Sequence, residues 1–383
     1  MALQEPVQAA IDALIASGEE TGLQVAVLHA GHVVADAVAG IADERTGAPA
    51  EPGTLFFATS AGKGVATSVA HVLVEHGELD YEQRVADVWH EFGAHGKDRV
   101  TVRDVLVHAA GVPGLWPDIT PVDLGDWDRV CAFLADQRPW WEPGTKTGYH
   151  ALTFGYVLGE VVRRTTGRTL ADALRDEIAA PLGIEDELHF GVPAPLLPSV
   201  ARQGPEGAAP PRPERGSPQD RTVPPGVQPT AAFANRADVL RADIPAQGTM
   251  TARAAARMYT ALLGHLDGVR LVSSERLHMM AATAFSGVDQ VMGFPTSWAL
   301  GYSQARLGAK VSTGIDLRHG RLEWQRCLRR HRLWRRGRRH AQPHRRRLHR
   351  GQGHRRRRRR PPWLSRVQQP RVSRRSASPD ASP

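Results

Sequence analysis

The C-terminal end of the sequence sets the strongest limit on what this chain can fold into. Residues 317–383 contain 24 Arg, no Lys and two acidic residues, Glu323 and Asp380. This segment has a net charge of +22, so residues 1–316 contribute −13 to the chain's total of +9. A segment with so much charge of one sign cannot bury enough apolar surface to fold. We therefore predict a folded domain over 1–313 and an irregular arginine-rich tail over 314–383.

The rest of the sequence is typical of a globular protein with a sizeable core. The two cysteines, Cys131 and Cys327, are too few for a disulfide framework or a cysteine-rich metal site. The N-terminus lacks the basic region of a signal peptide, and no apolar run approaches the roughly 18 residues of a membrane span. These features predict a soluble cytoplasmic protein without a membrane partner.

The first forty residues predict a helix followed by a β-hairpin. Apolar residues recur at helical spacing over 6–17. Two β-rich runs over 23–40 then flank Ala30-Gly31-His32, which predicts a tight turn between strands. A helix packed on an antiparallel sheet indicates an α+β fold.

The stretch "FATSAGKGVA" over 57–66 places Ser60 and Lys63 three residues apart. The apolar residues that follow have the spacing of a buried helix face, so both polar residues fall in its first turn, and the helix is expected to end near Gly77. On one helix face the lysine amine can reach the serine hydroxyl, and the positive end of the helix dipole favours a deprotonated serine. The alternative is that Ser60 or Thr59 caps the helix while Lys63 is solvated.

Four further features follow in a specific order: "LVHAAGVPGL" over 106–115, "EPG" over 142–144, Tyr149 at the opening of a predicted helix that contains "GYVLGEVVRRTTG", and "PLGI" over 181–184. With S-x-x-K before them, they resemble the serine β-lactamase-like family, which comprises class C β-lactamases, related esterases and D-aminopeptidases. The resemblance extends over roughly residues 5–310. It implies a β-lactamase/transpeptidase-like fold, in which an antiparallel sheet flanked by helices and a helical lobe enclose the active site.

The resemblance also implies roles for three residues. Ser60 would be the acylated nucleophile, Lys63 its partner in proton transfer, and Tyr149 a general base and proton donor that acts with Lys63. Position 151 is Ala where β-lactamases carry Asn, which favours a serine carboxylesterase acting on a small-molecule ester without a metal or organic cofactor. A β-lactamase or D-aminopeptidase is the alternative.

Two other patterns near Tyr149 are interpreted as structural. Lys146-Thr147-Gly148 spells the family's third motif, K-T-G, but that motif belongs on a strand far downstream, and this copy follows Pro143-Gly144 in a predicted loop. His108 and His150 have no acidic residue at a useful spacing, so we expect them to serve packing and hydrogen bonding.

Downstream, the proline-rich stretch 204–229 predicts a long irregular loop that covers the cleft. Residues 235–264 predict a loop and an amphipathic helix capped by Thr251. Residues 297–308 predict a strand that enters the sheet.

The resemblance implies a third motif and final strands from about Gly314 onward, and without them the domain over 1–313 is incomplete at its C-terminal end. The tail that stands in their place allows two interpretations. Its arginines could form a nucleic-acid-binding arm attached to an inert hydrolase fold. Alternatively, the reading frame has shifted, because CGN codons read one base later become GNN codons for Gly, Ala, Val and Asp. With codons chosen to fit, 314–344 then gives two alternating strands, with Phe-Gly-Thr-Ala-Gly in the place of K-T-G.

The frameshift interpretation predicts a difference between two proteins. In this family one oxyanion donor comes from the strand of the third motif, and losing one such donor costs on the order of 10² to 10³ in rate. We expect the chain as written to be less soluble and at least about a hundredfold less active than a version restored to the shifted frame. Ester turnover per serine labelled by a fluorophosphonate probe measures this. Equal turnover and equal solubility would show that the arginine-rich tail is genuine.

Overall fold

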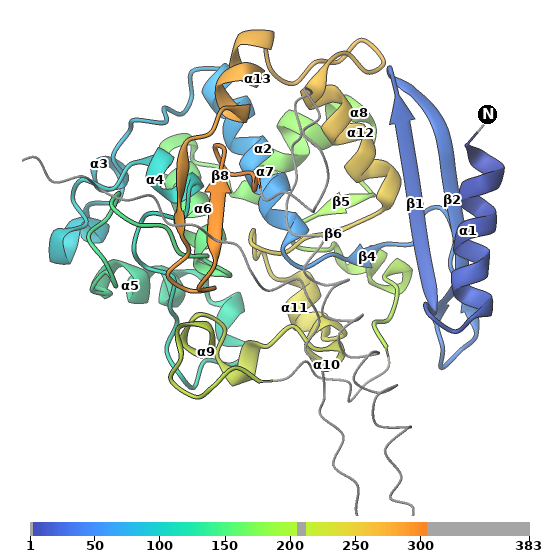
Figure 1. Cartoon of the computed structure of the whole chain (residues 1–383), viewed down its shortest axis with the longest axis horizontal. Helices are drawn as coiled ribbons and strands as arrows, with labels where there is room; N and C mark the ends of the chain where they lie inside the picture. Colours follow the sequence, from blue (N-terminus) through green and yellow to red (C-terminus); the bar gives the residue numbers. More distant parts are fainter. Residues whose placement is uncertain (1–2, 205–211, 305–383) are drawn as a thin grey trace, which may run out of the picture. The chain divides into compact units, whose positions relative to one another are not determined.

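The computed structural model describes residues 3–204 and 212–304, all within one unit, Met1–Leu333. The predicted tail over 314–383, with both interpretations of it, lies outside the described residues. Figure 1 shows helix α2 running through the middle of the described part, between a group of helices and an antiparallel sheet. None of the described helices is long and apolar enough to cross a membrane.

The N-terminal helix and hairpin form as predicted. Helix α1 (Gln4–Ala16) precedes strands β1 (Gly22–His29) and β2 (His32–Asp43), and β3 (Ala48–Pro49) pairs with β2. The turn between β1 and β2 places Ala30 and Gly31 at φ of 49° and 81°, the left-handed conformations of a tight hairpin turn. Helix α1 contacts β2 and helix α12 (Ala252–Leu263) contacts β1, on either side of the pair in Figure 1.

A second, small sheet connects distant parts of the chain. Its strands β4 (Phe56–Phe57), β6 (Thr249–Met250) and β5 (Leu188–His189) pair antiparallel in that order. Strand β4 leads into α2 (Ala61–Glu75), and β6 leads into α12. The Thr251 hydroxyl accepts from Ala254 N at 3.0 Å, so Thr251 caps α12 as predicted. The sheet therefore fixes the start of α2 beside the segment that ends at Gly248.

The helical group surrounds α2 and α6 (Thr153–Thr166). Its short helices bury apolar residues around these two, and α2 is buried from Gly62 to Val74. The remaining helices of this group are α3 (Val85–Val88), α4 (Val102–Leu106), α5 (Trp127–Asp136), α7 (Leu170–Leu174) and α8 (Ala180–Leu182). Beyond them lie α9 (Pro218–Thr222), α10 (Ala231–Ala234), α11 (Ala237–Arg241) and α13 (Ser274–Ala281). With the antiparallel sheets, this confirms the α+β, β-lactamase/transpeptidase-like fold.

Three local predictions need correction. Tyr149 does not open a helix, because α6 begins at Thr153 and Tyr149 lies in the loop before it. The described part of 204–229 is not wholly irregular, since Ser217 caps the short helix α9. In the described part of the strand predicted over 297–308, strand structure ends at Trp298, in β8 (Pro295–Trp298), which pairs with β7 (Phe285–Val288) as a hairpin. Residues 305–308 of that prediction lie outside the described residues.

The residues after β8 pack on the buried face of α2 through polar contacts. The Ser68 hydroxyl lies 2.9 Å from the Tyr302 hydroxyl, and His71 Nε2 lies 3.0 Å from the Leu300 carbonyl oxygen. Burial lowers the pKa of His71 to about 4, so this histidine is neutral at physiological pH. Neutral hydrogen bonds therefore attach the end of the described chain to α2.

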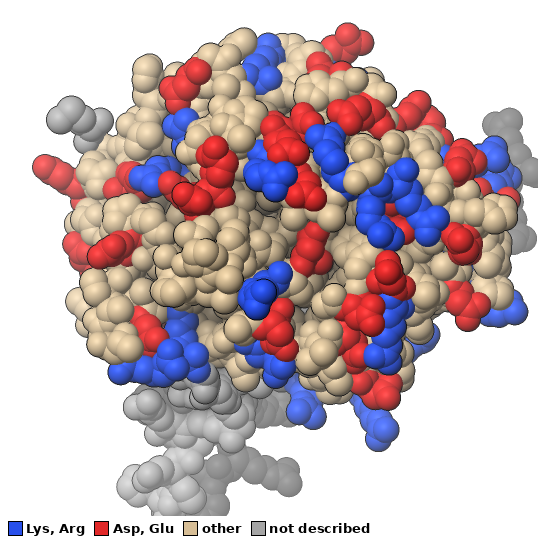
Figure 2. Space-filling view, turned by 180° about the vertical axis from the view of Figure 1, so that it is seen from behind, with Lys and Arg blue, Asp and Glu red and all other residues tan. Residues whose placement is uncertain are grey.

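The surface carries interspersed charges. Figure 2 shows acidic and basic side chains intermingled over the face opposite that of Figure 1. Several are paired across elements, as in Arg253 with Glu187 and Arg276 with Glu75.

Two glycines let the backbone over 245–248 approach both central helices. A Cβ on Gly62 of α2 would lie 2.2 Å from the Gln247 carbonyl carbon, and one on Gly155 of α6 would lie 2.4 Å from Ala246 N. Real Cβ atoms do not come so close to backbone atoms. The segment 245–248 is thus held between α2 and α6 at a distance that only glycine permits.

Substituting Gly62 tests this contact. In an open helix position Ala would stabilise the protein, but here the methyl group must displace the backbone of 247–248. We expect Gly62→Ala to lower the free energy of unfolding by about 1 to 3 kcal/mol, measured by urea denaturation. Gly53→Ala is the control, because nothing lies within 4 Å of the corresponding Cβ. Equal stability of the two variants would contradict the close approach.

Candidate active site

Ser60 stands at the junction between β4 and α2, in a strained piece of backbone. Thr59 before it has φ of 38°, a conformation that β-branched residues rarely adopt. Ser60 is the residue preceding α2, and its side chain makes no capping hydrogen bond. Strain of this kind persists where the surrounding structure imposes it, often at functional sites. The hydroxyl is therefore available for another partner.

Lys63 is that partner. Its side chain is fully buried, and Nζ lies 3.0 Å from Ser60 Oγ and 3.2 Å from the Ala246 carbonyl oxygen. Burial lowers the pKa of Lys63 to about 7, because the charged form loses its hydration. The alternative of a capping serine and a solvated lysine is wrong on both points. Near neutral pH, a large fraction of Lys63 has a free electron pair beside the serine hydroxyl.

The start of α2 also supplies a backbone donor. Within the described residues, no group accepts a hydrogen bond from Ser60 N–H. This N–H lies at the positive end of the helix, where a developing negative charge is stabilised. It can serve as one donor to an oxyanion formed next to Ser60 Oγ.

Tyr149 completes the set of predicted residues. Lys63 Nζ lies 4.9 Å from the centroid of its ring, so the amine faces the aromatic ring. This half-buried ring also stacks with Trp298, at 6.3 Å between centroids and 6° between planes. The structure thus brings Ser60, Lys63 and Tyr149 together. Lys63 Nζ contacts both the Ser60 hydroxyl and the Tyr149 ring.

Asp289 holds the Tyr149 backbone and was not identified from the sequence. It follows β7, is buried, and accepts through Oδ1 from the backbone N–H groups of Tyr149, Val291 and Met292 at 3.1, 2.9 and 2.8 Å. The same loop thereby fixes Tyr149 and, through β8, places Trp298 against its ring. A single Asp between two short strands gives no signal in the sequence that could have revealed this contact.

The two histidines near Tyr149 serve packing and hydrogen bonding, as predicted. His150 Nδ1 donates to the Gly148 carbonyl and Nε2 accepts from Val112 N, while burial lowers the pKa of His150 to about 4. His108 Nδ1 accepts from His150 N at 3.1 Å, and its ring packs against Tyr149 and Trp298. Neither ring contacts Ser60 or Lys63 in the described interactions.

The K-T-G copy over 146–148 lies in a loop, as predicted. The Thr147 hydroxyl is buried and donates to the Val107 carbonyl, and Gly148 N donates to the His108 carbonyl. Lys146 is exposed. These contacts hold the loop that carries Tyr149. Residues 146–148 belong to no strand in the described structure.

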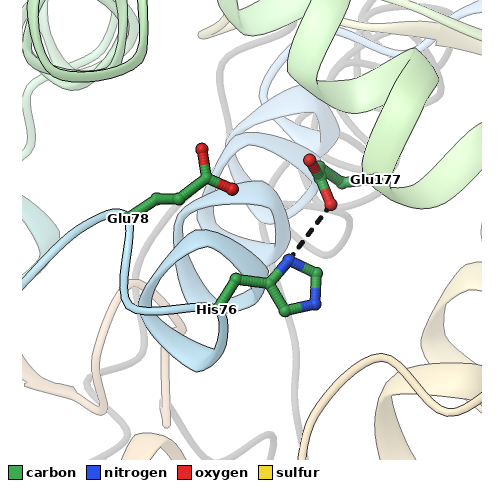
Figure 3. Close-up of side chains that lie close together, drawn as sticks. All are labelled: His76, Glu78 and Glu177. Carbon is green, nitrogen blue, oxygen red and sulfur yellow. Dashed lines mark ion pairs between the residues drawn. The ribbon is translucent and has the colours of Figure 1, made fainter.

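Among the described residues, one group has donors that could hold a metal ion: His76, Glu78 and Glu177 at the end of α2 (Figure 3). His76 Nδ1 lies 3.2 Å from Glu177 Oε2. However, Arg168 contacts both carboxylates, at 2.8 Å from Glu78 and 2.6 Å from Glu177. The arginine already provides the positive charge that a metal would bring, so the group is an ion-pair network rather than a metal centre.

The fold and the Ser-x-x-Lys pair at the start of a buried helix define a class, the β-lactamase-like serine hydrolases. The comparison with known families agrees. The chain belongs to the Beta-lactamase family, whose model matches residues 7–326. It is 35% identical over 303 residues to Esterase/beta-lactamase LipL of Mycobacterium tuberculosis (strain ATCC 25618 / H37Rv), over 75% of this chain and 70% of that protein.

Two solved structures are similar in fold and sequence. A family VIII carboxylesterase superposes with a TM-score of 0.73 at 30% identity, over 84% of this chain and 95% of the other. A penicillin-binding protein homologue from Caulobacter crescentus superposes with a TM-score of 0.70 at 37% identity, over 78% of this chain and 80% of the other. The family therefore includes relatives named for esterase and for penicillin-binding activities.

The Asp289 contacts predict a specific pattern of stability. Asp289→Ala leaves three backbone N–H groups without their acceptor, and we expect the free energy of unfolding to fall by about 2 to 4 kcal/mol. Asp289→Asn keeps the Oδ1 acceptor and should lose less than about 1.5 kcal/mol. Urea denaturation measures both. Equal losses for the two variants would show that the contacts do not stabilise the loop.

Proposed function

We propose that this protein hydrolyses carboxylic esters through an acyl-Ser60 intermediate. The observation that carries the proposal is the fully buried Lys63 Nζ at 3.0 Å from Ser60 Oγ. A serine hydroxyl needs a nearby base to become a nucleophile at neutral pH, and an amine with a pKa of about 7 is suited to that task.

In the proposed mechanism, Ser60 Oγ attacks the ester carbonyl carbon while its proton passes to neutral Lys63. Ser60 N–H donates to the oxyanion of the tetrahedral intermediate. The intermediate collapses when the C–O bond to the alcohol breaks, and the alcohol oxygen takes a proton from Lys63 through Tyr149. Water then adds to the acyl-Ser60 carbonyl with the same groups as base, which releases the acid and restores the serine.

Two observations favour esters over β-lactams. Residue 151 is Ala, so it offers no side-chain amide two residues after Tyr149 for a β-lactam substituent. The family VIII carboxylesterase covers more of this chain than the penicillin-binding protein homologue, although the latter has the higher identity. The relative named Esterase/beta-lactamase LipL, at 35% identity, makes β-lactam hydrolysis the second candidate.

The proposal predicts loss of ester turnover in two variants. Ser60→Ala removes the nucleophile and should lower kcat/KM for p-nitrophenyl butyrate by on the order of 10³ or more. Lys63→Met removes the base but keeps a buried side chain of similar size, and we expect a loss of roughly 10² to 10⁴. Ser17→Ala, an exposed serine at the end of α1, is the matched control and should turn over like the parent protein.

Urea denaturation of each variant separates loss of catalysis from loss of folding. Undiminished turnover in a folded Ser60→Ala protein would exclude the acyl-serine mechanism. Parallel assays with nitrocefin and a D-amino-acid amide test the other activities. Turnover of either compound with a higher kcat/KM than the ester would contradict the choice of ester.

A further inference from the structure

An open pocket of about 470 Å³ lies beside the loop that carries Tyr149. Three exposed cations, Arg138, Lys146 and Arg221, line it together with Trp140 and Trp141. None of the described residues that line it is acidic. The pocket therefore combines positive charge with aromatic surface.

The three cations have no acidic partner among the described residues, and they lie together in one pocket. None of them forms an ion pair with a described carboxylate, whereas arginines such as Arg168 and Arg253 are paired. The Arg221 guanidinium lies 4.0 Å from the centroid of the Trp140 ring. A cation–π contact of this kind does not consume the N–H donors of a guanidinium, which can also bind an anion.

Two residues that line the pocket contact the loop that carries Tyr149. A Cβ on Gly148 would lie 2.6 Å from the Trp141 ring and 3.3 Å from Gln290 Cβ, so both lining residues contact the residue next to Tyr149. Gln290 N also donates to the Thr147 carbonyl at 2.9 Å. Lys146 and Tyr149 are three residues apart, so their Cα atoms are separated by at most about 11 Å.

Arg221 reaches this pocket from the proline-rich segment. It lies in α9, and its carbonyl accepts from Leu115 N at 3.1 Å. The segment that the sequence predicts to cover the cleft thus brings a cation to the side where Tyr149 stands. In the proposed mechanism Tyr149 protonates the departing alcohol, so the alcohol part of the substrate passes along this side.

We propose that the pocket binds an anionic group, carboxylate or phosphate, on the alcohol part of the ester substrate. This inference rests on the proposed function. Lys146 and Arg221 supply the charge, and Trp140 supplies a surface for an aromatic or apolar spacer between the anion and the ester. The pocket then selects among esters by their leaving group rather than by their acyl chain.

Three acetyl esters of similar shape test the proposal. 4-Acetoxybenzoate and 4-acetoxyphenyl phosphate carry the two kinds of anion, and 4-acetoxybenzamide is the neutral counterpart. We expect the full-length protein to prefer at least one anionic ester over the amide by about tenfold in kcat/KM. The variant Lys146→Gln/Arg221→Gln should lose most of that preference. The preference should also fall as salt is raised from low concentration, because the cations are exposed.

The control variant is Arg99→Gln/Arg241→Gln, which removes two exposed arginines outside the pocket. The arginine-rich residues 317–383 are the same in every variant, so their charge cancels from the comparison. A preference that survives in the pocket variant, or that falls equally in the control, would overturn the proposal. The anionic ester that the parent protein hydrolyses with a higher kcat/KM than the amide shows which anion the pocket binds.

Binding without turnover separates this proposal from the proposed function. Calorimetric titration with 4-hydroxybenzoate and with 4-hydroxyphenyl phosphate measures the pocket directly. We expect weaker binding of at least one of them to the pocket variant than to the control. If no ester is hydrolysed but this difference is found, the proposed function fails and the anion pocket stands. If esters are hydrolysed and neither compound binds, the pocket proposal is wrong.

Discussion

The burial of the Lys63 amine is the interaction on which the rest of this site depends. Within the described residues, no carboxylate neutralises it, and its hydrogen-bond partners are the Ser60 hydroxyl and the Ala246 carbonyl. Lowering the pKa of this amine to about 7 corresponds to a free-energy cost on the order of 5 kcal/mol for the charged form, relative to water. Because of this burial, a large fraction of the amine beside the serine hydroxyl is neutral near pH 7.

The fold achieves this burial by bringing backbone, not side chains, against the start of α2. Gly62 and Gly155 let the segment 245–248 lie between α2 and α6, and Ala58 N donates to the Gly248 carbonyl at 2.7 Å. The Ala246 carbonyl is thereby directed at Lys63 Nζ. Tyr149 and Trp298 close another side with aromatic rings. The small sheet of β4, β6 and β5 holds these distant segments in register.

Local sequence patterns were sufficient for the elements that carry their own signal. The periodicity of α1, the turn at Ala30-Gly31 and the buried face of α2 predicted those elements and placed Ser60 and Lys63 in one turn. The contacts of Ala246 and Asp289 could not be predicted, because each is a backbone or single-residue contact between segments far apart in the chain. The loop position of Tyr149 was missed for a related reason. Tertiary hydrogen bonds to Asp289 and His108, rather than helix propensity, fix residues 148–150.

The rate at which a fluorophosphonate probe labels Ser60, measured as a function of pH, tests the central claim most directly. Only neutral Lys63 can accept the serine proton, and the neutral fraction rises as pH increases through the pKa of about 7. The account predicts labelling on the Ser60 peptide, located by mass spectrometry, with a rate that increases from pH 5 to 8 and has its midpoint near pH 7. A rate that first rises near the ordinary lysine pKa of about 10.4, or a label on another serine, would contradict it.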